Sequence, residues 1–319
     1  MIAILIIAIA GGAASALMFA SIISGALISL LLFYLAPLPL MVTALGWGPL
    51  AAAIGGVAAA STLGAIFGIP YAIAFAVMVA LPGWWLGHLA LLGRPVAAAD
   101  QGAAPDIEWY PVGRIMLWIA AFAVLTTVGA LLTLGTDADT ISATLRRGLL
   151  KVLSPRDGSI ASGEVERLVD ALVIIAPVAA TIVAMLTLTL NLWLAGKVTQ
   201  TSGRLHRPWP DLRSTMLPPM TLAALSAAIG LSFVGGLFAM LAQIVATALM
   251  IAYALIGFAV LHTVTLSFNG RAFWLAATYA ITVLFTWPIV ALIVLGIADA
   301  VFGLRQRYLR SRPPPLPVA

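Results

Sequence analysis

Residues 33–49 read FYLAPLPLMVTALGWGP, and this stretch decides how the N-terminal part of the chain folds. It contains no Asp, Glu, Lys or Arg, yet it carries three prolines and two glycines. Proline inside a helix removes a backbone hydrogen bond and clashes with the preceding turn. The stretch therefore predicts a short helix, a break at Gly46–Pro49 and a second helix. Pro37 and Pro39 fit a turn and a helix start at the end of the first crossing.

The composition around this stretch is that of an integral membrane protein. Of 319 residues, 63% are hydrophobic and 8% are charged, and the mean hydropathy is +1.13. A soluble domain usually carries about 25% charged residues. The apolar runs are continuous rather than alternating, which favours helices over a barrel. The chain has no cysteine, so disulfides and thiolate metal sites are excluded.

Polar residues divide the chain into about eight crossings, so we expect an all-α polytopic transmembrane bundle with one broken helix near the N-terminus. The expected spans are residues 3–34, 38–61, 70–92, 112–134, 171–195, 217–235, 236–267 and 273–302, the last kinked at Pro288. The transmembrane domain then covers 1–304, with polar segments at 94–111, 135–170 and 196–213. Residues 305–319 form a basic, proline-rich tail that we expect to be disordered. The first run is too long for a signal peptide and lacks a basic region before it, so we expect a retained span.

An amphipathic helix is expected in the second polar segment, in DTISATLRRGLLKVL at residues 139–153. Ile141, Leu145, Leu149 and Val152 recur at helical spacing, and the basic residues lie off that stripe. Such a helix lies in the membrane interface or packs on its own protein, and the pattern fits both.

The net charge of +5 comes from basic residues that lie between apolar runs and at the C-terminus. Lipid contact and topology explain them better than nucleic acid does. With eight spans, seven basic residues fall on one side, and nine, from Arg146 to Arg167 and from Arg305 to Arg312, fall on the other. The positive-inside rule then places both termini in the cytoplasm. A ninth crossing within the first 93 residues would move only the N-terminus.

Signatures of catalysis are absent from the sequence. It contains no HExxH, no GxSxG, no Walker loop, and no cluster of His or carboxylates at metal-ligand spacing. We therefore expect no enzyme activity, no catalytic residues, no metal site and no cofactor.

Four polar side chains within the apolar runs are candidates for binding a substrate, and each has a structural alternative. Asp299 could contact an ion or pair with Arg305, and His262 could bind a ligand or form one interhelical hydrogen bond. Asn191 and Gln243 could line a cavity or link helices as neutral amides.

Small residues recur at helical spacing in two places. Gly12, Ala16 and Ala20 lie four residues apart, and Gly64 and Gly68 form a second pair. Such stripes allow close helix contact within the chain or with a partner.

Three stretches together, LAPLPLMVTALGWGPLAAAIGG, IGFAVLHTV and VLGIADAVFGLRQR, resemble the YybS-like family of bacterial integral membrane proteins. That family is distantly similar to the substrate-binding S components of energy-coupling-factor transporters. The resemblance implies an inner-membrane location, a membrane-embedded pocket for a vitamin or metal ion, and separate ATPase subunits. It places Pro37, Asn191, Gln243, His262 and Asp299 around that pocket.

Two functions follow from these observations. The first is the substrate-binding part of a transporter for a small molecule or ion, because broken helices expose backbone polar groups where a cavity satisfies them. The second is a non-transporting scaffold that assembles with other membrane subunits, which the small-residue stripes, the interfacial helix and the basic tail favour.

Overall fold

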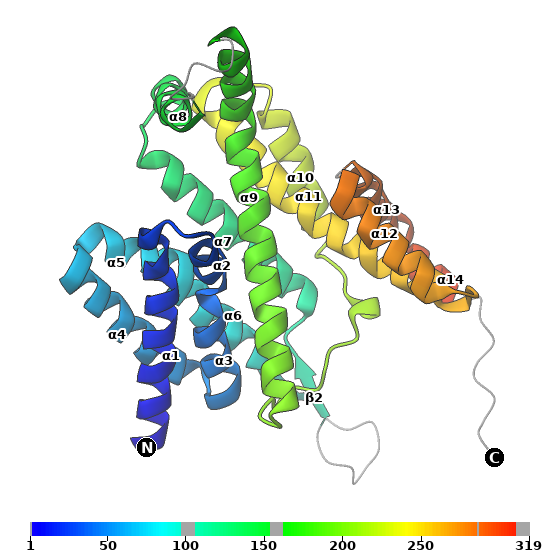
Figure 1. Cartoon of the computed structure of the whole chain (residues 1–319). Coiled ribbons are helices and arrows are strands. Elements are labelled where there is room, and N and C mark those ends of the chain that lie inside the picture. The colour runs from blue at the N-terminus through cyan, green and yellow to red at the C-terminus, as the bar shows by residue number, and fades with distance from the viewer. Residues whose placement is uncertain (1, 97–105, 154–161, 286, 311–319) are drawn as a thin grey trace, which may run out of the picture.

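The computed structural model describes residues 2–96, 106–153, 162–285 and 287–310, and most of them are helical (Figure 1). The helices are α1 (Ile2–Ala20), α2 (Leu27–Leu35), α3 (Pro37–Trp47), α4 (Pro49–Phe67), α5 (Ile69–Phe75), α6 (Leu81–Leu91), α7 (Val112–Leu132), α8 (Ala138–Leu153), α9 (Ser162–Thr201), α10 (Met220–Leu231), α11 (Gly236–Val264), α12 (Arg271–Phe285), α13 (Pro288–Phe302) and α14 (Leu304–Arg310). Strands β1 (Gly93–Val96) and β2 (Asp106–Trp109) pair antiparallel. Seven helical segments in these ranges are long and apolar enough to cross a membrane, or eight if the bent pair α13 and α14 is one span. The predicted polytopic helical bundle is confirmed.

Four of these spans fall in the N-terminal part of the chain, where three were predicted. They are Ile2–Ser24, Leu27–Trp47, Pro49–Phe67 and Ile69–Leu91. The expectation of one crossing over residues 3–34 is wrong, because the 3-10 turn Ser21–Ser24 and Gly25, at φ +67°, interrupt that run. The turn is built from serine and glycine rather than from charges, so hydropathy gives no sign of it.

Pro37 therefore lies in the middle of a span and not at the end of one. Helices α2 and α3 together make the span Leu27–Trp47, and Ala36 between them keeps right-handed helical dihedrals. The break before Pro49 is confirmed, since Gly48 at φ +99° separates α3 from α4. That φ value suits glycine and few other residues. This break joins two spans, whereas the sequence placed it inside one crossing over 38–61.

Helices α10 to α14, which we call the C-terminal group, comprise one long helix and several short ones. Helix α11 has 29 residues, whereas α10 has 12 and α12 and α13 have 15 each. At about 1.5 Å per residue the short helices reach roughly 18–22 Å, less than the roughly 30 Å of a hydrocarbon core. The expected crossings over 217–235 and 273–302 are thus corrected to a short helix and to two separate helices. Pro288 begins α13 at a position that tolerates proline, instead of bending one long helix.

Glycines allow the closest helix contacts, and all of these lie within the chain. A Cβ on Gly257 would overlap the backbone of Leu292, and one on Gly296 would overlap that of Tyr253, so α11 and α13 are in backbone contact. Gly12 contacts the backbone of Gly55 in the same way between α1 and α4. The first small-residue stripe of the sequence therefore serves intramolecular packing at Gly12.

The amphipathic helix is α8, and it packs on its own protein through its first half. Ile141 is fully buried with Leu131 and Ile244, whereas Val152 is 80% exposed. Asp137 precedes the helix and accepts hydrogen bonds from the Thr140 amide and hydroxyl at 2.8 and 2.7 Å. The same contacts lower the pKa of Asp137, the side-chain bond from Thr140 contributing most.

The polar segments and the tail are only partly described. Residues 97–105, 154–161 and 311–319 lie outside the described ranges. The expectation of disorder is wrong for residues 305–310, which form α14 with Arg305 buried.

The loop after α9 is hydrogen-bonded to the end of the bundle that carries the β-hairpin. Arg207 donates to the carbonyls of Ala90 and Tyr110 at 3.1 and 3.0 Å. Burial lowers the pKa of Arg207. Arg305 donates to the carbonyl of Arg213 at 2.8 Å, so α14 lies beside this same loop.

These contacts regroup the basic residues. Among the described residues ten lie on the segments that these contacts, together with those of α11 with α12 and α14, bring to one end of the bundle: Arg94, Arg114, Lys197, Arg204, Arg207, Arg213, Arg271, Arg305, Arg307 and Arg310. Four lie at the end that carries α8: Arg146, Arg147, Lys151 and Arg167. The expected grouping of Arg305–Arg310 with the α8 segment is wrong, because α12 and α13 return the chain to the side from which α12 began.

Candidate functional site

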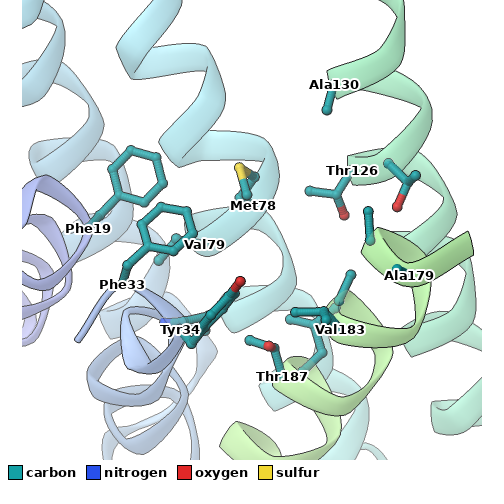
Figure 2. A pocket seen from close by; sticks show the side chains of 15 residues that line it. Phe19, Phe33, Tyr34, Met78, Val79, Thr126, Ala130, Ala179, Val183 and Thr187 are labelled. Atoms are coloured by element: carbon teal, nitrogen blue, oxygen red, sulfur yellow. The ribbon is translucent and has the colours of Figure 1, made fainter. Parts of the chain in front are cut away.

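A cavity of about 330 Å³ lies between the N-terminal helices and the pair α7 and α9 (Figure 2). Its lining residues are Phe19, Phe33, Tyr34, Pro37, Met78, Val79, Thr126, Thr127, Ala130, Ala179, Ala180, Val183, Ala184, Thr187 and Leu188. We call it the kink cavity. Ala130 and Ala180 on its rim are exposed, and Val183 is 39% exposed, so the cavity opens sideways from the bundle.

Three irregular helices meet at this cavity. Pro37 interrupts the span Leu27–Trp47 near its centre, and the π-helical turn Ala76–Ala80 interrupts the span Ile69–Leu91 near its centre. Pro177 lies inside α9, just before the lining residues Ala179 and Ala180. Prolines and π-turns are established causes of helix distortion, and π-turns are frequent at functional sites. The cavity is therefore bounded by two interrupted helical spans and by the proline-containing part of α9.

Asn191 satisfies the backbone that the Pro37 distortion frees. Its Nδ2 donates to the carbonyl of Tyr34 at 2.8 Å and to that of Thr187 at 2.7 Å. A free carbonyl in a membrane interior costs several kcal/mol, about the cost of a lost hydrogen bond there. Asn191 thus links α9 to the kink beside the cavity. Its Oδ1 is buried and has no hydrogen bond in the described part of the chain.

The polar groups of the kink cavity are hydroxyls. The Tyr34 hydroxyl points toward α7 and α9 (Figure 2). Thr126 donates to the Phe122 carbonyl, and the hydroxyl oxygen of Thr127 lies 3.3 Å from that of Thr181, which donates to the Pro177 carbonyl at 2.8 Å from behind the lining. None of the lining residues is Asp, Glu, Lys, Arg or His. This chemistry suits a largely apolar molecule with one or two polar groups and does not suit a bare ion.

The other candidates from the sequence lie elsewhere. Gln243 is exposed on α11. His262 Nε2 lies 2.8 Å from the Tyr279 hydroxyl, a hydrogen bond between α11 and α12. The structure therefore places Pro37 in the cavity lining and Asn191 beside that lining, at the Tyr34 carbonyl, and it places Gln243, His262 and Asp299 in the C-terminal group. No group of three His, Cys, Asp or Glu side chains that could hold a metal occurs among the residues described.

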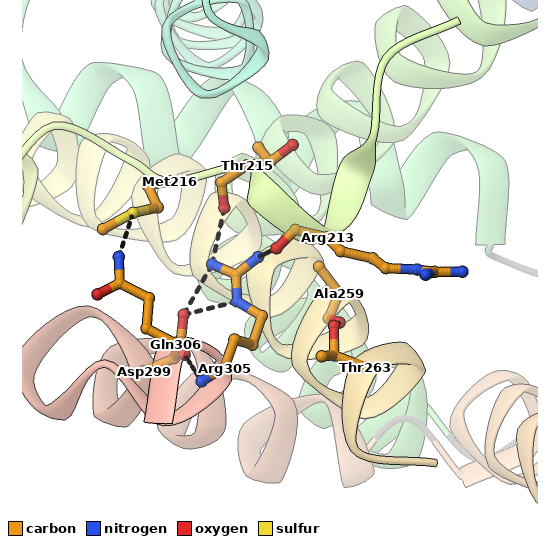
Figure 3. Close-up of polar contacts among 8 residues, drawn as sticks. All are labelled: Arg213, Thr215, Met216, Ala259, Thr263, Asp299, Arg305 and Gln306. Carbon is orange, nitrogen blue, oxygen red and sulfur yellow. Dashed lines mark hydrogen bonds and ion pairs between the residues drawn. The ribbon is translucent and has the colours of Figure 1, made fainter. Parts of the chain in front are cut away.

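Asp299 pairs with Arg305, the structural alternative that the sequence left open. Arg305 Nη2 lies 2.7 Å from Asp299 Oδ2, and both side chains are about 95% buried (Figure 3). The Arg305 amide and Nε also donate to the carboxylate at 2.8 Å. The remaining donors reach the carbonyls of Arg213 and Thr215 at 2.8 and 2.7 Å. The pair fixes α14 against the loop before α10.

Sequence reasoning missed several residues of the kink cavity. Tyr34, Thr126, Thr127 and Thr187 line the cavity and are not among the candidate residues of the sequence. Pro82 and Pro177 were available signals, since each lies inside a predicted span. The π-turn Ala76–Ala80 itself carries no proline or glycine, but Pro82 follows it and cannot donate to the carbonyl of Met78, four residues earlier.

Comparisons with known proteins give a family and no function. No curated protein and no solved structure matches the chain. A family model described as a predicted membrane protein, DUF2232, matches residues 13–300, which is most of the chain and includes both the kink cavity and Asp299. The chain belongs to the DUF2232 family of predicted membrane proteins.

Proposed function

We propose that this chain is the substrate-binding part of a membrane transporter, and that its substrate is a small, largely apolar molecule. The observation that supports this is the convergence of Pro37, the π-turn Ala76–Ala80 and Pro177 on one cavity near the centre of the spans. Transporters commonly place their sites at such breaks, because distorted helices can move and their backbone can be satisfied by a cavity.

The sequence resemblance to YybS-like proteins and to S components is part of this proposal. In it the chain catalyses no reaction, needs no cofactor and binds no nucleic acid, and separate membrane subunits supply the energy. The hydroxyl-lined kink cavity favours a molecule over a metal ion as the substrate. Of the five residues that the sequence assigned to the pocket, Pro37 lines this proposed site, and Asn191 supports it by bonding the Tyr34 carbonyl.

The membrane orientation is also a proposal. The end that carries the β-hairpin and α14 holds ten of the described basic residues, against four at the end that carries α8. The positive-inside rule therefore favours a cytoplasmic location for both termini in the inner membrane. The expected location of the termini is kept, although the residues that argue for it have changed.

The proposal is tested by extracting the protein gently from its native membrane into nanodiscs and identifying retained molecules by native mass spectrometry. Ala180→Trp fills the kink cavity, and Ala171→Trp is the matched control, because Ala171 is exposed on the same helix outside the cavity. We expect one molecule to be retained by the wild type and by Ala171→Trp, and to fall at least about tenfold in Ala180→Trp. Cellular uptake of that molecule should fall in parallel. Retention by all three proteins equally, or binding without any effect on uptake, would contradict the transporter proposal.

The second candidate is a scaffold that assembles with another membrane protein. The last residues of α8 favour it, because Val152 is 80% exposed at the end of a helix with both apolar and basic faces. Stable co-purification of a partner that is lost in Val152→Asp, while uptake of small molecules is unchanged, would favour this function over transport.

A further inference from the structure

A second cavity, of about 390 Å³, lies where α7 and α10 begin, against α11 and α13. We call it the arginine cavity. It is separate from the kink cavity and shares none of its lining residues. Its walls are mostly apolar and include Leu217, Leu222 and Val301.

Two helix N-termini meet at the arginine cavity. Pro111 precedes α7, Pro218 and Pro219 precede α10, and all three prolines line the cavity. The N-terminus of a helix carries a partial positive charge and free amide groups, and both attract anions. The two ends are held together, because Gly113 in the first turn of α7 contacts the carbonyl of Met216.

Arg114, in the first turn of α7, adds a full positive charge. Its side chain is exposed, lines the cavity and lies 6.0 Å from the centre of the Tyr110 ring. It has no ion pair with a carboxylate in the described ranges. The two other charged residues of the lining, Asp299 and Arg305, neutralise each other in their buried pair. The net charge at the cavity is therefore positive.

Tyr253 supplies an independent sign of a ligand. It lines the cavity from α11, and only 1% of its surface is exposed. Its hydroxyl forms no hydrogen bond with any residue that the structure describes. The hydroxyl is therefore free to donate to an acceptor that a ligand brings into the cavity.

We propose that the arginine cavity binds a phosphate group, and that this group is the head of an acidic phospholipid. Arg114 pairs with the phosphate, the Tyr253 hydroxyl donates to one of its oxygens, and the helix N-termini stabilise the charge. The apolar walls at Leu217, Leu222 and Val301 hold the beginning of an acyl chain. Basic pockets between helices are a known means of binding acidic headgroups, and the walls distinguish a lipid from free phosphate.

The test uses the full chain in nanodiscs of phosphatidylcholine with a minor fraction of phosphatidylglycerol. Native mass spectrometry counts the phosphatidylglycerol that stays bound. Arg114→Gln removes the pairing charge, and Arg307→Gln is the matched control, since Arg307 is exposed on α14 and does not line the cavity. We expect wild type and Arg307→Gln to retain one phosphatidylglycerol, and Arg114→Gln to retain at least about tenfold less. Arg114→Lys should restore most of the binding, and Tyr253→Phe should weaken it without changing the fold.

Free phosphate is compared in a second arm. We expect a short-chain phosphatidylglycerol to raise the unfolding temperature of the wild type in detergent, and inorganic phosphate at the same concentration to leave it unchanged. Equal protection by inorganic phosphate would overturn the lipid as the ligand. Equal phosphatidylglycerol retention by Arg114→Gln and Arg307→Gln would overturn the site itself.

Discussion

The N-terminal spans and the C-terminal group both bury polar groups inside the bundle, but they satisfy those groups in different ways. Around the kink cavity the helices are long enough to cross fully, two of the spans are interrupted near their centres, and Asn191 satisfies the carbonyl that one interruption frees. Around α11 the helices α10, α12 and α13 stop short, and a buried ion pair between α13 and α14 secures the end of α13 against the loop before α10. The comparison teaches that distortion at mid-span leaves room for a ligand, whereas short helices require polar anchors where they end.

The ion pair gives the strongest test of this contrast. Asp299→Leu leaves Arg305 buried without its counter-charge and should lower the free energy of unfolding by about 3–5 kcal/mol. The double variant Asp299→Leu with Arg305→Met removes both charges and should recover most of that loss. Unfolding titrations in mild detergent measure both. If single and double variants are equally unstable, the pair does not anchor the C-terminal group.

Close glycine contacts between helices occur in both regions, and disrupting one in either region should lower the free energy of unfolding by a similar amount. Gly296→Leu would force α13 from the backbone of Tyr253, and Gly12→Leu would force α1 from that of Gly55. Each should cost about 1–3 kcal/mol of stability, as overpacking does. The matched controls are Gly230→Leu and Gly129→Leu, because a Cβ at either position meets open space. A control as unstable as its partner would show that close contact is not the cause.

The hydrogen bond from Asn191 to the Tyr34 carbonyl can be tested against an exposed amide elsewhere in the bundle. Asn191→Leu removes the donor to the Tyr34 carbonyl and should lower stability by about 1–2 kcal/mol, with weaker ligand retention. Gln243→Leu makes a comparable change at an exposed amide and should stay within about 0.5 kcal/mol of the wild type. Thermal unfolding measures the two side by side. A similar loss of stability in both variants would show that the Asn191 hydrogen bond does not stabilise the kink beside the cavity.

Features of the fold that depend on residue type alone could be predicted from the sequence, and features that depend on tertiary contacts could not. Composition gave the membrane class, and Gly48–Pro49 gave the helix break, because both depend on residue type alone. The turn at Ser21–Ser24 was missed, because its residues are uncharged and two of them are isoleucine, so the hydropathy of the run stays high across it. The buried pair of Asp299 and Arg305 was weighed correctly, because the two residues lie close in sequence.

The kink cavity was only half predictable. Pro37 drew attention to the correct segment, but the opposite wall on α7 and α9 depends on which helices become neighbours. Residues such as Tyr34 and Thr187 are distant in sequence, and no local pattern relates them. Gln243, His262 and Asp299 are polar residues in apolar runs like Asn191, and only the tertiary structure separates them from it.

The smallest effect concerns α8, which lies outside both regions. Hydrogen bonds from Thr140 hold the pKa of Asp137 below its ordinary value of 3.8. The ionised carboxylate therefore stabilises the start of α8 fully above about pH 3.8, and this contribution is lost as the pH falls through the lower folded value. Amide exchange of α8 should rise at that acidic limit in the wild type and stay flat in Asp137→Asn. The same acid response in both proteins would show that Asp137 does not cap the helix.

The central claim is that the kink cavity holds a ligand between α2, α3, α7 and α9. The most direct measurement is a high-resolution density map of the protein taken gently from its native membrane. We predict one ordered density beside Tyr34, Pro37 and Thr187, with a polar end near the Tyr34 hydroxyl. A cavity closed by Leu188 and Val183, or filled only by bulk lipid chains continuous with the bilayer, would contradict the claim.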